Sequence, residues 1–240
     1  NYEKEDWHNS QYTNIIEKVI IEENVIKIGQ RAFYRCYNLS SIEIPDSIIE
    51  IGNGAFSGCR SLADIEIPKR ITKIGDSTFS GCSSLTHINL SENITFIDFE
   101  AFSGCINLTN VTIPKSVGDL RYNAFGDCSS LENINVDENN KNYMSENGIL
   151  FNKEKTEIIK FPEAKKDIIN YEIPETVTSI GSEAFSGVSN LESVKIPNSV
   201  INIGESAFEN CSKLENINIP ENVTKIETYT FFGCSNLKSI

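Results

Sequence analysis

The sequence predicts a repeat solenoid, mainly β, in which each unit of 23 residues contributes one short parallel strand and one short helical or 3-10 turn. Three observations support this prediction. Phenylalanine recurs every 23 residues, cysteine and leucine recur at fixed offsets from it, and alternating aliphatic residues precede a proline in most units. A unit of this length cannot close a core by itself, so stacked copies must bury the recurring side chains against one another.

The phenylalanine column gives the repeat its period. Eight of the 13 phenylalanines fall in it, and the 23-residue step is broken only by one gap of 60 residues between Phe125 and Phe185. All seven cysteines follow a column phenylalanine by three residues, Val188 takes the remaining place, and a leucine follows three residues later. These apolar columns are expected to line one continuous core. The phenylalanine column comprises Phe33, Phe56, Phe79, Phe102, Phe125, Phe185, Phe208 and Phe231.

The elements of one unit follow from its residue types. Residues 42–44 alternate Ile, Glu and Ile, a period of two that predicts a short strand with one face inward. Pro45 ends this strand because proline has no N–H for a ladder, and Gly52 marks a second bend. The following Ala55 and Phe56 suit a short helical or 3-10 turn that packs its phenylalanine inward. Stacking such units predicts a parallel sheet with one strand per turn.

The repeat is incomplete at its two ends. Residues 1–13 precede the first recognisable half-turn and are expected to form an N-terminal flank or cap, whereas residues 14–240 are expected to form a single solenoid. The chain stops at Ile240, inside the next strand, so the last turn has an unpaired edge. We therefore expect the natural protein to continue past this residue, and the 240-residue chain to associate end to end with another copy.

The long gap between phenylalanines contains an irregular hairpin insertion at about residues 137–171. Its segments 148–151 (GILF) and 158–162 (IIKFP) flank the polar sequence NKEKTE, which predicts a β-hairpin with a short charged loop. Phe161 and Pro162 are expected to mimic the aliphatic-proline end of a repeat strand.

Composition and charge exclude several classes of protein. The hydrophobic share of 39% is ordinary for a globular chain. The net charge of −13 has the wrong sign for binding a phosphate backbone or an anionic lipid surface, so no nucleic-acid partner is expected. No apolar run is long enough to span a bilayer, so no membrane insertion is expected either.

The cysteines are expected to be buried free thiols. Val188 occupies the same repeat position, which indicates that this position requires a small apolar side chain. Disulfides between neighbouring turns are the alternative, because stacked strands bring equivalent residues within bridging range. A metal site is not expected, since the chain has two histidines and no CxxC motif, and no cofactor is expected.

Candidate catalytic residues are few. The two histidines are His8, in the N-terminal flank, and His87, at an outward strand position. Glu43 lies on the turn adjacent to Asp64 and Glu66, and a glycosidase needs two such carboxylates at a fixed separation. An exposed acidic sheet face explains these carboxylates without catalysis, so no catalytic residue is expected.

The unit IGNGAFSGCRSLADIEIP at residues 51–68 resembles the BspA-type leucine-rich repeat, which occurs in surface proteins of bacteria and some parasitic protists. The resemblance covers about residues 14–240, and departures such as Asp98 and Glu227 at the glycine position are few. It implies a leucine-rich-repeat fold and a secreted or cell-surface protein, often a virulence-associated adhesion module that engages host glycoproteins. It transfers no binding residue, because the recurring residues of a repeat family form the scaffold.

The outward strand positions are the main candidates for ligand binding. A parallel stack aligns them into a ladder across an extended face, here called the strand face. This face has no aromatic stacking platform, which argues against a dedicated sugar binder. The alternative is that its polar residues only keep an exposed sheet soluble. The candidate residues are Ser41, Glu43, Asp64, Glu66, His87, Asn89, Asn110, Thr112, Asn133, Asn135, Ser193, Lys195, Asn216 and Asn218.

The insertion offers a second candidate surface, since irregular segments on a rigid scaffold often bind ligands. Tyr143, Phe151 and the charged residues 153–157 are its expected contact residues, unless the hairpin only patches the solenoid. Together these features predict a non-catalytic, adhesin-like interaction module that binds a host or extracellular-matrix protein, including glycoproteins. A structural spacer or presentation stalk is the alternative. A carbohydrate-active enzyme, a more distant alternative, rests only on the acidic pairs.

Overall fold

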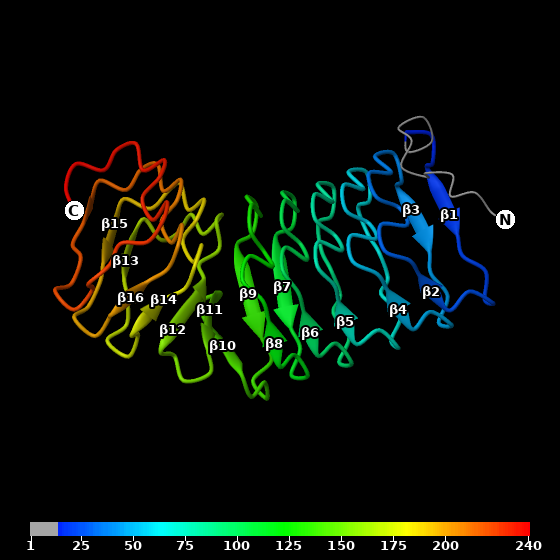
Figure 1. The fold of residues 1–240 in the computed structure, drawn as a ribbon, viewed down its shortest axis with the longest axis horizontal. Coiled ribbons are helices and arrows are strands. Elements are labelled where there is room, and N and C mark those ends of the chain that lie inside the picture. Colours follow the sequence, from blue (N-terminus) through cyan, green and yellow to red (C-terminus); the bar gives the residue numbers. More distant parts are fainter. Residues whose placement is uncertain (1–13) are drawn as a thin grey trace. The chain divides into compact units, whose positions relative to one another are not determined.

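The computed structural model describes residues 14–240, which form successive turns of short β-strands (Figure 1). Contacts divide the chain into two compact units. Unit 1 is residues 14–108 together with Ser116–Phe125, and unit 2 is Thr109–Lys115 together with Gly126–Ile240. Within each unit, paired strands of the regular turns join residues about 23 positions apart, so the predicted repeat solenoid of mainly β structure is confirmed.

The first ladder of strands lies at the predicted positions. Lys18, for example, pairs with Ser41, and Ser193 pairs with Asn216. Residues 64–66 and 87–89 occupy the same position in their turns without ladder pairing. The strands of this ladder are β1 (Lys18–Ile20) and β3 (Ser41–Glu43) in unit 1, and β7 (Asn110–Ile113), β9 (Asn133–Val136), β13 (Asn170–Glu172), β15 (Ser193–Lys195) and β17 (Asn216–Ile217) in unit 2.

The structure adds a second parallel ladder, just before the glycine position of most turns (Figure 1). The turns approach one another closely there, and a Cβ on Gly52 would lie 2.5 Å from the backbone nitrogen of Gln30. Glycine therefore permits the stacking at this point. The strands are β2 (Lys27–Ile28), β4 (Glu50–Ile51), β5 (Lys73–Ile74), β6 (Phe96–Ile97) and β8 (Asp119–Leu120) in unit 1, and β12 (Glu157–Lys160), β14 (Ser179–Ile180) and β16 (Asn202–Ile203) in unit 2.

The third side of each turn is the segment between the glycine and the cysteine. The short helical or 3-10 turn expected here is instead a series of hydrogen-bonded turns, and residues 14–240 contain no helix. Tyr34 N–H donates to Arg31 O within the turn at 3.1 Å, whereas Phe33 N–H donates to Ala55 O of the next turn at 2.8 Å. Arg31 and Arg35 have φ values of 56° and 58°, which breaks any helix and lets alternate N–H groups reach the next turn.

The core of each unit contains stacked phenylalanine rings. In unit 1, the Phe79 ring centroid lies 5.5 Å from that of Phe56 and 5.4 Å from that of Phe102, with nearly parallel planes. In unit 2, Phe185 and Phe208 stack at 4.9 Å. Leucines of the repeat are buried alongside them. This spacing is within the range of offset-stacked aromatic pairs, so the columns predicted from the sequence form the cores.

The insertion forms an antiparallel sheet that continues into the second ladder of unit 2. The predicted hairpin is confirmed, because β11 (Ile149–Asn152) pairs with β12. A further strand, β10 (Tyr143–Glu146), pairs with the other edge of β11. The regular register resumes at β13, where Asn170 pairs with Ser193.

The prediction that Phe161 and Pro162 mimic the end of a repeat strand is wrong. The Phe161 ring stacks on Phe185 at 5.1 Å, and its N–H donates to Ala184 O at 2.7 Å. Phe161 therefore takes the place of a column phenylalanine. The reason is that Ile158 pairs with Ile180 in the second ladder, so the residues after it belong to the third side of the turn.

A buried ion pair ties the insertion to the next turn of unit 2. Lys160 Nζ lies 3.3 Å from Glu163 Oε1, and the two side chains are only 7% and 6% exposed. The ammonium group also donates to the carbonyl oxygens of Glu183 and Ser186, both at 3.4 Å. Burial raises the pKa of the Glu163 carboxyl, although Lys160 partly opposes this effect.

We expect Phe79→Ala to lower the free energy of unfolding by about 3 to 5 kcal/mol, because it leaves a cavity between two stacked rings. Urea denaturation followed by circular dichroism measures this change. Phe232→Ala is the control, since that ring is 61% exposed and its loss should cost less than about 1 kcal/mol. Equal costs for the two variants would contradict the assignment of the phenylalanine column to the core.

We expect Lys160→Met to destabilise unit 2 by about 3 kcal/mol, because it leaves the Glu163 carboxyl buried without its partner. The matched control is Lys195→Met, which removes an exposed lysine that lies 3.3 Å from Glu172 and should cost less than about 1 kcal/mol. Thermal unfolding of both variants gives the comparison. A Lys160→Met protein as stable as the control would show that the buried pair is dispensable.

Candidate functional site

The predicted strand-face residues of unit 1 are exposed to solvent, namely Ser41, Glu43, Asp64, Glu66, His87 and Asn89. Glu43 forms an ion pair with Lys18 on the preceding turn, with 2.8 Å between oxygen and nitrogen. Glu66 and Asn89 line one shallow pocket together with Asp46 and Lys69. Neighbouring turns thus bring polar groups of several kinds together on one surface.

The strand face of unit 2 is a set of cross-turn polar contacts. Asn133 Nδ2 donates to Asn110 Oδ1 at 3.0 Å, and Thr112 is the register partner of Asn135. Asn133 is half-buried, because Lys165 of the insertion reaches its Oδ1 at 3.4 Å. The remaining candidates at Asn110, Thr112 and Asn135 are exposed.

Asn170 and Glu172 also belong to the strand face, although the sequence analysis did not include them. Ser193 Oγ donates to Asn170 Oδ1 at 2.6 Å, and Lys195 Nζ lies 3.3 Å from Glu172 Oε1. Both partners lie 23 residues before a predicted candidate, so the repeat step could have identified them. Further along, Ser239 Oγ donates to Asn216 Oδ1 at 3.1 Å, and Asn218 is exposed.

The geometry around His87 is that of a surface pair. Its Nε2 lies 3.3 Å from Asp64 Oδ1, and its Nδ1 lies 3.1 Å from the hydroxyl of Thr86. All three side chains are exposed, so water competes for each of these contacts. A catalytic triad is effective when its nucleophile and oxyanion site are shielded from water, whereas these three side chains are exposed. The geometry therefore favours the non-catalytic interpretation. His8 and the rest of the predicted cap lie outside the described residues.

The insertion offers less contact surface than the sequence indicated. Phe151 is 0% exposed, so its prediction as a contact residue is wrong. It lies on β11, where Ile149, Leu150 and Phe151 are all buried, so side chains on both faces of this strand are covered. Tyr143 is half-buried, and Lys155 forms an ion pair with Glu146 at 2.5 Å.

An aromatic cluster that the sequence analysis missed lies on unit 1. Phe99 and Tyr122 are 37% and 59% exposed, and their ring centroids are 4.8 Å apart in an edge-to-face arrangement. The guanidinium carbon of Arg121 lies 5.6 Å from the Phe96 ring and 5.8 Å from the Phe99 ring. Tyrosine, arginine and phenylalanine are enriched at protein interfaces. The signal in the sequence was that an aromatic residue replaces, in two adjacent turns, the polar residue that follows the glycine position.

None of the seven cysteines forms a disulfide in the structure, which argues against the disulfide alternative. Cys82 Sγ donates to Phe56 O on the preceding turn at 3.2 Å, and Cys105 Sγ donates to Phe79 O at the same distance. The repeat position therefore accommodates a weak donor as well as a small apolar group. Burial raises the pKa of the Cys59 and Cys105 thiols to about 12.

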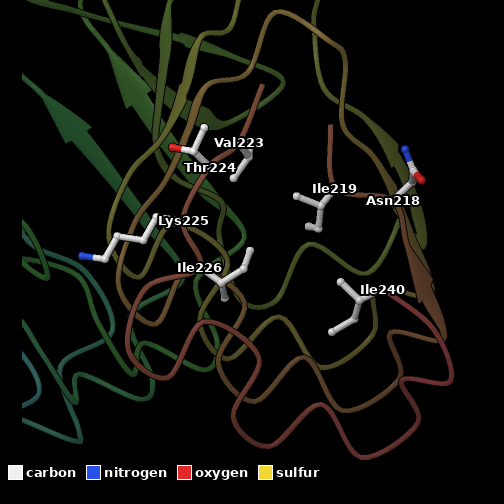
Figure 2. Close-up of a pocket in the computed structure, with 7 residues that line it drawn as sticks. All are labelled: Asn218, Ile219, Val223, Thr224, Lys225, Ile226 and Ile240. Atoms are coloured by element: carbon white, nitrogen blue, oxygen red, sulfur yellow. The ribbon is translucent and has the colours of Figure 1, made fainter. Parts of the chain in front are cut away.

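At one end of unit 2, Ile219, Val223, Ile226 and Ile240 line an open pocket (Figure 2). Figure 2 shows the Lys225 side chain directed away from these apolar groups. Ile226 and Ile240 are about half-exposed or more, at 47% and 66%. Asn218, Thr224 and Lys225 complete its lining, so the pocket is an open surface of mixed apolar and polar character.

Among residues 14–240, no group of three or more histidine, cysteine, aspartate or glutamate side chains is placed to hold a metal ion. The described part of the chain also contains no helix of the length and apolarity that crossing a bilayer requires.

A model of the BspA type leucine rich repeat region matches residues 9–132, 89–171 and 156–240, with six copies. The chain belongs to this family. No curated protein matches the sequence significantly. The BspA-type fold accounts for the short strands, the stacked phenylalanines and the 23-residue step together.

Solved structures of bacterial leucine-rich repeat proteins resemble the chain over most of its length. A leucine rich cell surface protein from Faecalibacterium prausnitzii is 35% identical, with a TM-score of 0.85 over 93% of this chain and 60% of that protein. The pneumococcal vaccine antigen PcpA is 31% identical, with a TM-score of 0.85 over 92% and 55%. A leucine-rich repeat protein from Eubacterium ventriosum is 28% identical, with a TM-score of 0.79 over 94% and 66%. The chain thus spans less than two thirds of these relatives.

Thiol labelling tests the burial of the cysteines. We expect Cys59, Cys82 and Cys105 to react with a disulfide reagent only on unfolding, whereas half-buried Cys234 reacts first. Burial raises the pKa of the Cys59, Cys82 and Cys105 thiols in the folded protein. Labelling of these three should therefore not accelerate between about pH 7 and about pH 9, whereas labelling of an exposed thiol does. Urea-unfolded protein, in which all seven thiols react, is the control. Fast labelling of all seven in the folded protein would contradict this interpretation.

Proposed function

We propose that this chain is a non-catalytic protein-interaction module of a secreted or cell-surface protein, and that it binds host or extracellular-matrix proteins through the strand face. The observation that carries the proposal is the exposure of the strand face. Within each unit, polar side chains at equivalent positions of neighbouring turns contact one another and form an ordered surface. Such a surface offers hydrogen-bond donors and acceptors at fixed positions, at little cost in side-chain ordering on binding.

The relatives support the surface location. The Faecalibacterium protein is described as a cell surface protein, and PcpA as a vaccine antigen. Repeat scaffolds commonly present extended binding faces of this kind. The aromatic cluster of Phe99 and Tyr122 adds a second exposed surface to unit 1, with residue types that are frequent in protein interfaces.

Binding of the 240-residue chain to a panel of immobilised extracellular-matrix glycoproteins tests the proposal. We expect saturable binding, reduced at least about tenfold when Glu66, Asn89 and Asn135 are changed together to alanine, because each removes an exposed polar contact. The control variant changes Thr72 and Asn202 to alanine. Both residues are exposed but do not lie on the strand face, so this variant should bind like the parent. Equal losses in both variants would contradict a site on the strand face.

A structural spacer is the second candidate function, favoured by the same cross-turn contacts, which satisfy part of the strand face internally. A spacer is expected to bind none of the immobilised glycoproteins. The strand-face variant and the parent should then give the same result in every binding assay. The carbohydrate-active alternative requires free paired carboxylates. Glu43 is occupied by Lys18, which weighs against that alternative.

We also propose that the chain self-associates through the open pocket at the end of unit 2, with a second copy covering the apolar side chains of Ile226 and Ile240. Both are exposed side chains that line the same pocket. Sedimentation at rising protein concentration should show dimers, and Ile226→Asp should abolish them, because it places a charge in an apolar contact. A monomer at all concentrations would remove this proposal.

A further inference from the structure

A basic and aromatic cluster, here called the Arg-Tyr cluster, occupies the third side of the first two turns of unit 1. It consists of Arg31, Tyr34, Arg35, Tyr37 and Arg60. Residues 30–38 and 53–61 contain these three arginines and no acidic residue, in a chain with a net charge of −13. The equivalent segments of later turns mostly carry acidic residues, including Asp76, Glu100, Asp127, Glu183, Glu205 and Glu209.

The tyrosine rings hold the three guanidinium groups in place. The guanidinium carbons of Arg31 and Arg35 lie 5.6 and 5.0 Å from the centroid of the same Tyr34 ring. That of Arg60 lies 4.8 Å from the centroid of the Tyr37 ring. A cation–π contact with a ring leaves the N–H groups of the guanidinium available to donate hydrogen bonds to a ligand. The arginines are exposed, and none of the three has a carboxylate within 4.0 Å among residues 14–240.

Glycines on the second turn let the arginine side chains lie along the surface. A Cβ at Gly54 would lie 3.3 Å from Arg31 Cγ, and a Cβ at Gly58 would lie 3.2 Å from Arg35 Cγ. Arg35 also adopts a φ of 58° at a position where five later turns have glycine. A left-handed conformation is unfavourable for arginine, so Arg35 occupies this position against the local backbone preference.

We propose that the Arg-Tyr cluster binds an acidic peptide segment of a partner protein. Arginine forks bind carboxylates through two parallel hydrogen bonds, and arginine clusters recognise acidic motifs in this way. The half-buried tyrosines add apolar contact area beside the charges. This surface is separate from the strand face, so the inference extends beyond the proposed function.

The extent of the cluster favours a short peptide over a long polyanion. It spans two turns, and the next turns of unit 1 present Asp76 and Glu100 on the same side. An extended sulfated polysaccharide would run onto these carboxylates and be repelled. A few carboxylates on a short segment match the three guanidinium groups without that cost.

Fluorescence anisotropy with a labelled oligoglutamate peptide tests the proposal, with an oligoglutamine peptide as the uncharged control. We expect saturable binding of oligoglutamate that weakens as salt rises from about 50 to about 200 mM. Changing Arg31, Arg35 and Arg60 together to glutamine should reduce the affinity at least about tenfold. Changing the same three to lysine should cause a smaller loss, because lysine keeps the charge but not the fork.

The matched control changes Arg70, Lys166 and Lys213, which are exposed, to glutamine. It alters the net charge equally and should bind oligoglutamate within about twofold of the parent. The strand-face variant should also bind it normally, so the two proposals fail independently. Circular dichroism confirms that each variant is folded. Equal binding of the two peptides, or equal losses in the cluster and control variants, would overturn the proposal. So would binding of heparin without oligoglutamate, which would assign the cluster to sulfated polysaccharides.

Discussion

The rest of each unit depends on the backbone hydrogen bonds between neighbouring turns. These bonds join residues about 23 positions apart in sequence. They run along three sides of the turn: two parallel ladders and the third side, where alternate N–H groups reach the next turn. A fixed step places each residue beside its counterpart on the next turn. The phenylalanines therefore stack ring on ring, and Cys59, Cys82, Cys105, Cys211 and Cys234 each donate to a phenylalanine carbonyl of the preceding turn.

The same constraint determines the chemistry of the surface. Polar residues that are 23 positions apart become neighbours, so Glu43 meets Lys18, and Asn133 meets Asn110. These contacts order the strand face, and they also consume part of its hydrogen-bonding capacity. A partner would therefore compete with cross-turn pairs on this face, whereas the guanidinium groups of Arg31, Arg35 and Arg60 have no carboxylate partner to displace among the described residues.

The positions that depart from the repeat carry several of the distinctive surface features of this chain. Phe99 and Tyr122 stand in adjacent turns at a repeat position that is polar elsewhere, and they form an exposed aromatic cluster. Arg35 replaces glycine at a left-handed position. The insertion departs most in sequence, yet its Phe151 and Phe161 are buried in the core of unit 2. Sequence irregularity and surface exposure are therefore separate properties in this chain.

The sequence by itself determined the repeat, its core columns and the outward strand positions, because a 23-residue period has few other physical explanations. It also predicted the hairpin of β11 and β12 from alternating apolar residues around a polar loop. Only the tertiary structure decided what covers each side chain. Phe151 is buried because β11 is covered on both faces, and Phe161 joins the phenylalanine stack because Ile158 sets its register. The Arg-Tyr and aromatic clusters likewise arise between turns, where side chains distant in sequence meet in space.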